Sequence, residues 1–89
     1  MMFNVYAIFD EKMEEFSEPF IQRPNAVERS VNLLVGKSPV PKEDLTLWEL
    51  GTWDSEFGVL KAFDKPCFVQ IEGLSDVVPE VILQKEIVK

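Results

Sequence analysis

The sequence predicts an α+β domain in which a small, mostly antiparallel sheet carries one main helix on a face, in the order β-β-α-β-β-β. The chain has 89 residues, of which 46% are hydrophobic, and this suits one compact core. Several short segments alternate apolar and polar residues with a period of two, as half-buried strands do. One segment repeats its apolar residues at helical spacing, and the connections between strands are too short for parallel crossovers.

The first two strands are predicted before the helix. Residues 3–10 alternate well and place four apolar side chains on one face: Phe3, Val5, Ala7 and Phe9. An acidic loop follows, and residues 16–22 then form a second extended segment. Pro19 lies within that segment, and proline cannot donate a ladder hydrogen bond. The second segment is therefore predicted at an edge of the sheet.

The main helix is predicted over residues 26–35. Asn25 is a good N-cap, and Glu28 stands three residues further on, which is the spacing of a capping box. Gly36 supplies a stop directly after the helix. The apolar residues at positions i, i+4, i+7 and i+8 form one stripe: Val27, Val31, Leu34 and Val35.

Three more strands are predicted after a loop that is broken twice by proline. Residues 45–54 form a strand, a turn follows at 54–58, and 59–63 return as its hairpin partner. Residues 67–72 form the last strand. Gly51 inside its strand indicates a bulge or the close approach of another backbone. Regular alternation places two side chains of this strand on opposite faces: Trp48 and Trp53.

One α+β domain over residues 1–73 and a C-terminal tail over 74–89 are predicted. The tail suits either a second, short helix that starts at Pro79 or a strand. It is rich in apolar residues for a terminus, so we expect it to pack on the body of the protein or on a second subunit of a homo-oligomer. The candidate contact residues are Val78, Val81, Ile82 and Ile87.

The composition argues against an enzyme, a metal site and a membrane protein. The chain has no histidine, so it lacks both a Ser-His-Asp triad and a Cys-His pair. Its single Cys67 cannot form an internal disulfide or a thiolate zinc site, and a lone thiol fits a reducing cytoplasm. No apolar run approaches the roughly 18 residues of a membrane helix, and the first residues lack the basic start of a signal peptide. We therefore predict no catalytic residue, no metal ligand and no cofactor.

The charge argues against a broad nucleic-acid surface. Acidic residues number 16 and basic residues 9, which gives a net charge of −7, whereas affinity for nucleic acid comes mainly from Lys and Arg. A local groove stays open as a hypothesis, because aromatic rings on the predicted strands can stack on the bases of single-stranded DNA. Core packing of the same rings is the competing interpretation. The candidate residues for the groove are Tyr6, Arg23, Arg29, Trp48, Trp53, Lys61 and Phe63.

Several spaced motifs resemble those of a known family. They are the segment Val-Tyr-Ala-Ile-Phe-Asp at 5–10, Pro19-Phe20-Ile21, Arg29-Ser30, the segment Leu-Trp-Glu-Leu-Gly-Thr-Trp-Asp at 47–54, and Gly58. In this order they resemble the small nonstructural protein of gokushovirus-type microviruses, which are tailless phages with a circular single-stranded DNA genome. The resemblance covers roughly residues 5–63.

The resemblance implies an accessory protein that is made during infection in the cytoplasm of the bacterial host and is absent from the mature virion. Its role would lie in the synthesis of single-stranded viral DNA or in genome packaging, and DNA binding is sometimes ascribed to the family. The resemblance transfers no catalytic residue. Together with the charge of −7, it favours a protein that acts mainly through contacts with phage replication or procapsid proteins.

Two alternatives stay open beside protein contacts. The first is direct binding of single-stranded DNA through the candidate groove. The second is an acidic mimic of DNA that occupies the basic cleft of a host protein and inhibits it. The mimic would require five acidic residues to cluster on one face: Asp10, Glu11, Glu14, Glu15 and Glu18.

Overall fold

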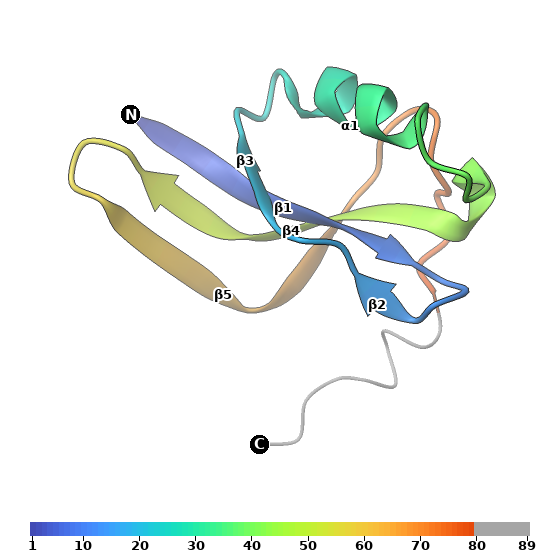
Figure 1. The fold of residues 1–89 in the computed structure, drawn as a ribbon. Coiled ribbons are helices and arrows are strands. Elements are labelled where there is room, and N and C mark those ends of the chain that lie inside the picture. Colours follow the sequence, from blue (N-terminus) through green and yellow to red (C-terminus); the bar gives the residue numbers. More distant parts are fainter. Residues whose placement is uncertain (80–89) are drawn as a thin grey trace.

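The computed structural model describes residues 1–79, which form a curled antiparallel sheet with one short helix (Figure 1). β1 is the central strand: β4 pairs with one of its sides, and the two short strands β2 and β3 pair with the other. β5 pairs with the outer side of β4. The elements are β1 (Met2–Asp10), β2 (Glu15–Phe16), β3 (Phe20–Gln22), α1 (Val27–Val35), the 3-10 turn η1 (Lys42–Asp44), β4 (Leu45–Asp54) and β5 (Val59–Val69).

The predicted fold class, an α+β domain built from a sheet and a main helix packed on its face, is wrong: the curled sheet dominates, and the helix adds only three buried valines to the core. Of the described residues, 44% lie in strands and 15% in helical segments, so the fold is a mostly-β half-barrel. Three strands precede the helix and two follow it, in place of the predicted β-β-α-β-β-β order. The sheet dominates because β1, β4 and β5 each extend over 9 to 11 residues, whereas the one helix has 9.

Pro19 explains the extra strand before the helix. The single segment predicted over 16–22 is interrupted around this proline and becomes two strands, β2 and β3. Both still pair with the same side of β1, because the chain continues in the same direction after the interruption. Proline has no N–H for the ladder, so the pairing lapses there without a change of partner.

The last two predicted strands are one strand in the structure. β5 replaces the segments 59–63 and 67–72 and includes Pro66 between them. Its register against β4 shifts at this point: Ala62 faces Gly51, whereas Cys67 faces Glu49. The five positions from Ala62 to Cys67 along β5 thus correspond to two positions along β4. The extra residues of β5 form a large bulge, and this bulge accommodates the proline.

The helix ends as predicted but begins without the predicted cap. Its N-cap is Ala26, which makes no side-chain hydrogen bond, so the capping box of Asn25 and Glu28 does not form. The helix ends at Val35, directly before Gly36. Leu34, which the stripe prediction placed in the core, is 52% exposed. The buried stripe consists of three valines spaced by four residues: Val27, Val31 and Val35.

One part of the core lies between α1 and the side of the sheet that we call the helix face. Tyr6 of β1 and Leu45 and Leu47 of β4 form one buried cluster with the three helix valines. Leu47 is completely buried, and Tyr6 is 2% exposed. The Tyr6 ring stacks on Phe20 of β3 with 5.9 Å between centroids. The helix thus contributes three valines to the core on this face.

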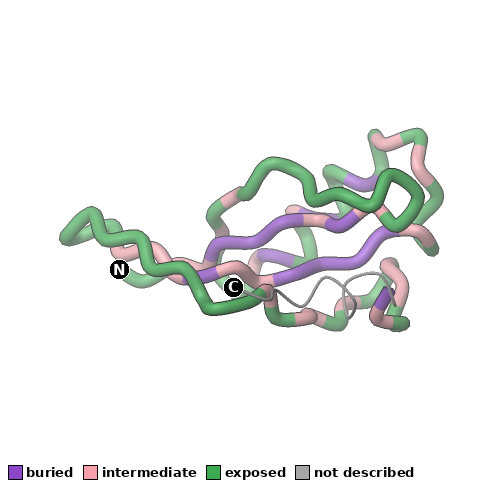
Figure 2. The backbone as a smooth tube through the Cα atoms, turned by 90° about the horizontal axis from the view of Figure 1, so that it is seen from below, coloured by how far each residue is buried: buried purple, intermediate pink, exposed green. Residues whose placement is uncertain are grey.

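The opposite side of the sheet, which we call the aromatic face, carries ring contacts across four strands. Phe16 of β2 lies 4.9 Å from Phe9 of β1 and 6.3 Å from Trp48 of β4, between centroids, and Trp48 lies 5.3 Å from Phe68 of β5. Phe9 is 0% and Trp48 4% exposed. The Trp48 Nε1–H donates a hydrogen bond of 2.7 Å to the Thr46 hydroxyl. Both faces of the sheet thus contribute to the core, and Figure 2 shows the buried backbone concentrated in neighbouring strands.

The predicted tail is described only as far as Pro79. Within it, Leu74 packs against the core cluster, and the Ser75 N–H donates a hydrogen bond of 3.2 Å to the Leu45 carbonyl. Val78 is half-buried. The other three candidate contact residues of the tail lie outside the described residues, so their contacts and a homo-oligomer stay predictions: Val81, Ile82 and Ile87.

Candidate interaction surface

The hairpin of β4 and β5 ends in a tightly hydrogen-bonded turn. The Asp54 Oδ1 accepts hydrogen bonds from the N–H groups of Glu56 (2.9 Å) and Phe57 (3.4 Å), and the Gly58 N–H donates to the Asp54 carbonyl (2.8 Å). Gly58 has φ of 66°, a left-handed conformation that glycine adopts without a steric cost. The turn predicted over 54–58 is therefore confirmed, and its backbone is held in one conformation.

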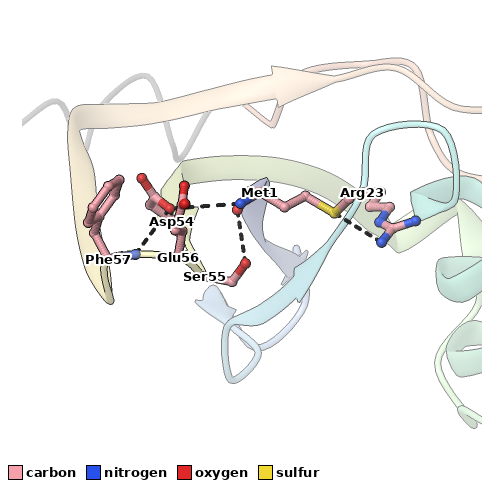
Figure 3. Close-up of polar contacts among 6 residues, drawn as sticks. All are labelled: Met1, Arg23, Asp54, Ser55, Glu56 and Phe57. Atoms are coloured by element: carbon pink, nitrogen blue, oxygen red, sulfur yellow. Dashed lines mark hydrogen bonds and ion pairs between the residues drawn. The ribbon is translucent and has the colours of Figure 1, made fainter.

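The first residue of the chain joins this turn to the rest of the protein (Figure 3). Ser55 donates two hydrogen bonds to the Met1 carbonyl, one from its N–H (3.0 Å) and one from its hydroxyl (3.1 Å). The Met1 ammonium lies 3.9 Å from the Asp54 Oδ1. The Arg23 Nη2 lies 3.0 Å from the Met1 sulfur. Three segments far apart in the sequence thus meet at this end of the sheet.

A row of side chains crosses the aromatic face at the same end. Phe3 of β1 lies opposite Trp53 of β4, and Trp53 lies opposite Leu60 of β5. Residues directly opposite in an antiparallel pair share a face, so the three side chains are neighbours. The Arg23 guanidinium carbon lies 5.4 Å from the centre of the Phe3 ring, in cation–π geometry. We call these four residues the exposed row: Phe3, Arg23, Trp53 and Leu60.

The exposed row differs from the rest of the aromatic face in its accessibility. Leu60 is 64% exposed, and Phe3 and Trp53 are half-buried. Within residues 1–79, no carboxylate lies within ion-pair distance of Arg23. The row therefore offers apolar area, two aromatic rings and one cation on a rigid support. This is the composition from which binding hot spots are built.

Two of the rings predicted to bind DNA are buried on opposite faces. Tyr6 belongs to the core under α1 and is 2% exposed. Trp48 belongs to the aromatic face and is 4% exposed. In this conformation neither ring offers a face on which a base could stack. The core-packing interpretation of the sequence therefore describes their positions.

The other five candidates are only partly brought together. Arg23 and Trp53 share the exposed row. Lys61 neighbours Trp53 across the hairpin but lies opposite Thr52, on the helix face. Arg29 is exposed on α1, and Phe63 is 37% exposed in the bulged part of β5. The structure thus unites two of the predicted residues and distributes the rest over the surface.

The predicted site lacks two members of the exposed row, Phe3 and Leu60. The alternation of residues 3–10 assigns Phe3 to the face of the buried Phe9, and this favours a core position for it. In the structure Phe3 is half-buried, and at its position β1 pairs with β4 alone among the described strands, since the pairing of β1 with β3 ends at Asn4. The register of the hairpin against β1 is the signal that would have identified both residues.

We expect the stability of the fold to fall above pH 10 because of Tyr6. Burial raises the pKa of Tyr6 above its ordinary value of 10.0, and the negative charge of Glu49, which lies opposite it on β4, raises it further. A phenol whose pKa is higher in the folded state contributes its full stability below the unfolded pKa and loses it as the pH rises. The chain has one tyrosine, so an absorbance titration reports Tyr6 alone. Ionisation at its ordinary pKa in the folded protein would contradict the burial, and Tyr6→Phe should remove this part of the alkaline destabilisation.

Acidic residues are dense around the turn between β1 and β2, at the end of the sheet away from the β4–β5 hairpin (Figure 1), although the hairpin turn also carries Asp54 and Glu56. The turn between β1 and β2 is joined to η1, since the Glu11 N–H donates to the Asp44 carbonyl (2.9 Å) and the Lys12 Nζ lies 3.5 Å from the Asp44 Oδ2. Over residues 1–79, no three acidic, cysteine or histidine side chains are arranged to hold a metal ion. The residues that the mimic hypothesis requires lie at this end: Asp10, Glu11, Glu14, Glu15 and Glu18.

Comparison with known proteins places the chain in a family. Residues 3–77 match the family described as Phage ORF5 protein. The match includes all strands from Phe3 of β1 onward, the helix and the whole exposed row. No curated protein and no solved structure matches the chain. In the described part of the chain, no helix is long and apolar enough to span a membrane. The chain belongs to the Phage ORF5 protein family.

Proposed function

We propose that this phage protein is a non-enzymatic accessory of the gokushovirus-type microviruses. It acts in the cytoplasm of the infected host during the synthesis or packaging of single-stranded viral DNA and is absent from the mature virion. It works mainly through contacts with phage replication or procapsid proteins. The observation that carries the proposal is the exposed row, an apolar and aromatic surface on a hairpin whose turn is fixed by hydrogen bonds.

The physical character of the exposed row favours a protein partner over a nucleic acid. Protein interfaces concentrate their binding energy in Trp, Tyr and Arg residues that lie in a well-packed centre, and the row contains Trp53 and Arg23 beside two apolar side chains. The hairpin does not need to be ordered on binding, so little conformational entropy is lost. A net charge of −7 opposes a broad contact with phosphates.

A variant of the exposed row tests the proposal in infected cells. Leu60→Ser removes the most exposed apolar side chain of the row, and Leu33→Ser on α1 is the matched control, because the two leucines are 64% and 65% exposed. Crosslinking of the tagged protein followed by mass spectrometry should recover a phage replication or procapsid protein with the wild type and with Leu33→Ser. Recovery of that protein, and the amount of single-stranded viral DNA, should fall at least several-fold with Leu60→Ser.

Two results would contradict the proposal. One is that no phage replication or procapsid protein is recovered with the wild-type chain. The other is that Leu60→Ser and Leu33→Ser give the same recovery and the same amount of single-stranded DNA. Circular dichroism of both purified variants shows whether the fold is intact, so a loss caused by unfolding is separable from the loss of a contact.

Binding of single-stranded DNA at the exposed row is the second candidate. It is favoured by the Arg23 guanidinium above the Phe3 ring and by the half-buried Trp53 beside it. Stacking of a base on one aromatic ring contributes roughly 1–3 kcal/mol. A single cation in the row supports only one or two phosphate contacts, so such binding would be weak and local.

Tryptophan fluorescence separates the two candidates. If DNA binds the row, oligo-dT should quench Trp53, and Trp48→Phe should keep the quenching because Trp48 is buried. Trp53→Phe should abolish it. The logarithm of the binding constant should fall with the logarithm of salt concentration with a slope of about −0.7 for each phosphate contacted. Absence of quenching at low salt would exclude DNA from the row and leave the protein contact as the function of this surface.

A further inference from the structure

Four side chains at the centre of the aromatic face are almost completely buried. They come from the neighbouring strands β1 and β4, and their exposed fractions lie between 0% and 4%: Ala7, Phe9, Thr46 and Trp48. Side chains that project from one sheet stand next to one another, so they cover each other's sides but leave their outer ends open. A sheet face reaches such burial when a second layer packs on it. The aromatic face therefore requires a cover.

The described chain supplies a second layer only on the other side of the sheet. α1 packs on the helix face (Figure 1), and three loop residues join the same core cluster: Val40, Ile71 and Leu74. Over residues 1–79, the ring contacts of Trp48 come from the sheet itself, from Phe16 of β2 and Phe68 of β5. Phe16 is 36% exposed and Phe68 is half-buried, so these rings flank Trp48 without closing the face.

The path of the chain after β5 leads toward this open face. Leu74 still packs on the helix face, and the Ser75 N–H donates a hydrogen bond of 3.2 Å to the Leu45 carbonyl, at the edge of β4. The next residues pass this edge, and Figure 1 shows the described chain running from the side of α1 to the opposite side of the sheet. Val78 is half-buried, and Pro79, the last described residue, is buried. The chain thus reaches residue 79 in a covered position on the side of the aromatic face.

Residues 80–89 have the length and the composition of a cover. Half of them are apolar, in two groups at 81–83 and 87–88: Val81, Ile82, Leu83, Ile87 and Val88. An extended chain spans at most about 3.3–3.6 Å per residue, whereas neighbouring strands lie only about 4.8 Å apart. The segment is therefore long enough to cross β4, β1 and β2.

The covalent attachment of this segment favours it over a second copy of the protein. A segment joined by a short connection has an effective concentration on the order of millimolar at a site nearby. A second copy would have to reach a comparable concentration to compete, and two molecules that each carry a net charge of −7 repel one another. The segment itself has two glutamates and two lysines, so it brings no net side-chain charge to the acidic body: Glu80, Lys85, Glu86 and Lys89.

We propose that residues 80–89 cross the aromatic face of their own chain and pack their apolar side chains over Trp48 and the rings that flank it. The tail then packs on the body of its own chain and not on a second subunit. While the segment is in place, the aromatic face is closed to a partner, and the exposed row stays accessible. This contact does not use the exposed row, so its failure would leave the proposed function intact.

The fluorescence of Trp48 tests the proposal in the full chain. Trp53→Phe leaves Trp48 as the single tryptophan. In that background, Leu83→Ser together with Ile87→Ser should raise the rate of quenching by acrylamide several-fold and shift the emission to longer wavelength, because water then reaches the ring. Leu33→Ser is the matched control, since Leu33 is 65% exposed on α1, and it should change neither quantity. A Trp48 that is equally protected in the two variants overturns the proposal.

A nitroxide label shows which chain supplies the segment and leaves its apolar residues intact. A nitroxide quenches a tryptophan only at close range, so the native thiol is removed by Cys67→Ser and Trp53→Phe is kept. A label on Gln84→Cys should then quench Trp48 strongly, whereas a label on Leu33→Cys should have little effect. Equal quenching by the two labels overturns the proposal.

A mixing experiment with the same label separates the chain's own segment from that of a second copy. A chain labelled at Gln84→Cys that lacks both tryptophans, through Trp48→Phe and Trp53→Phe, is mixed with an unlabelled chain that contains Trp48 alone. The proposal expects no quenching in this mixture. Quenching there overturns it, because it assigns the aromatic face to the segment of a second copy.

Discussion

Gly51→Ala is expected to destabilise the protein by about 3 kcal/mol or more, because it forces a side chain into the backbone of the neighbouring strand. Gly51 is buried in β4, opposite Val5 of β1 and Ala62 of β5. A Cβ atom at this position would overlap the Lys61 carbonyl oxygen and lie 3.0 Å from the Ala62 Cα. Both are main-chain atoms, so no side-chain rotation relieves the overlap. The strands must separate or shift, and both ladders of β4 are affected.

Gly58→Ala is the matched control for this prediction. Gly58 has a φ of 66°, but nothing lies within 4 Å of the position its Cβ would take. The cost there is the left-handed conformation alone, about 1–2 kcal/mol. Urea denaturation of the three proteins gives the free energies of unfolding. A Gly51→Ala protein that is no less stable than Gly58→Ala would show that β5 does not approach β4 as closely as described.

Features that depend on a few neighbouring residues could be predicted from the sequence. Gly51 was predicted to mark a bulge or a close backbone approach, and both are present, since the register of β4 shifts beside it against β1 and against β5. The hairpin turn and the end of the helix at Gly36 were also predicted correctly. At the turn, the left-handed Gly58 and the hydrogen bonds to the Asp54 carboxylate decide the local backbone conformation, whereas Gly36 keeps a right-handed φ of −61° where the helix ends.

The fold class could not be predicted, because it depends on pairings between distant segments. Pro66 has the local character of a break, and the prediction accordingly ended one strand before it and began another after it. In the structure β4 is long enough to pair with the chain on both sides of the proline. The length of the partner strand, which no local pattern reports, therefore decides that β5 is one element.

The faces of the two tryptophans illustrate the same limit. Regular alternation places Trp48 and Trp53 on opposite sides of β4, because five positions separate them. The extra residue Leu50 shifts the register against β1, so that Trp48 faces Ala7 and Trp53 faces Phe3. Both tryptophans therefore lie on the aromatic face. The glycine pattern predicts a bulge at Gly51, but it does not report which residue is the extra one. The directions of the side chains on either side of the bulge therefore could not be predicted.

Phe9→Ala is expected to cost about 3–5 kcal/mol, since it removes a fully buried ring and leaves a cavity. Phe9 is 0% exposed and contacts the Phe16 ring, which in turn contacts Trp48. The loss would be a large part of the stability of a small domain, which is typically about 5–15 kcal/mol. Urea denaturation measures it, and the near-ultraviolet circular dichroism of Trp48 should weaken because its aromatic surroundings change.

Phe57→Ala is the matched control for Phe9→Ala, because it makes the same substitution at an exposed position. Phe57 is 74% exposed, and at protein concentrations where the chain is monomeric its replacement should change the free energy of unfolding by no more than about 0.5 kcal/mol. The difference between the two variants measures how much the aromatic face contributes to the core. If both variants were equally stable, the ring contacts across β2, β1, β4 and β5 would not hold the sheet together, and the helix face would be the only core. A large difference would instead establish that this sheet is stabilised from both sides, which explains why a helix of 9 residues suffices to complete the fold.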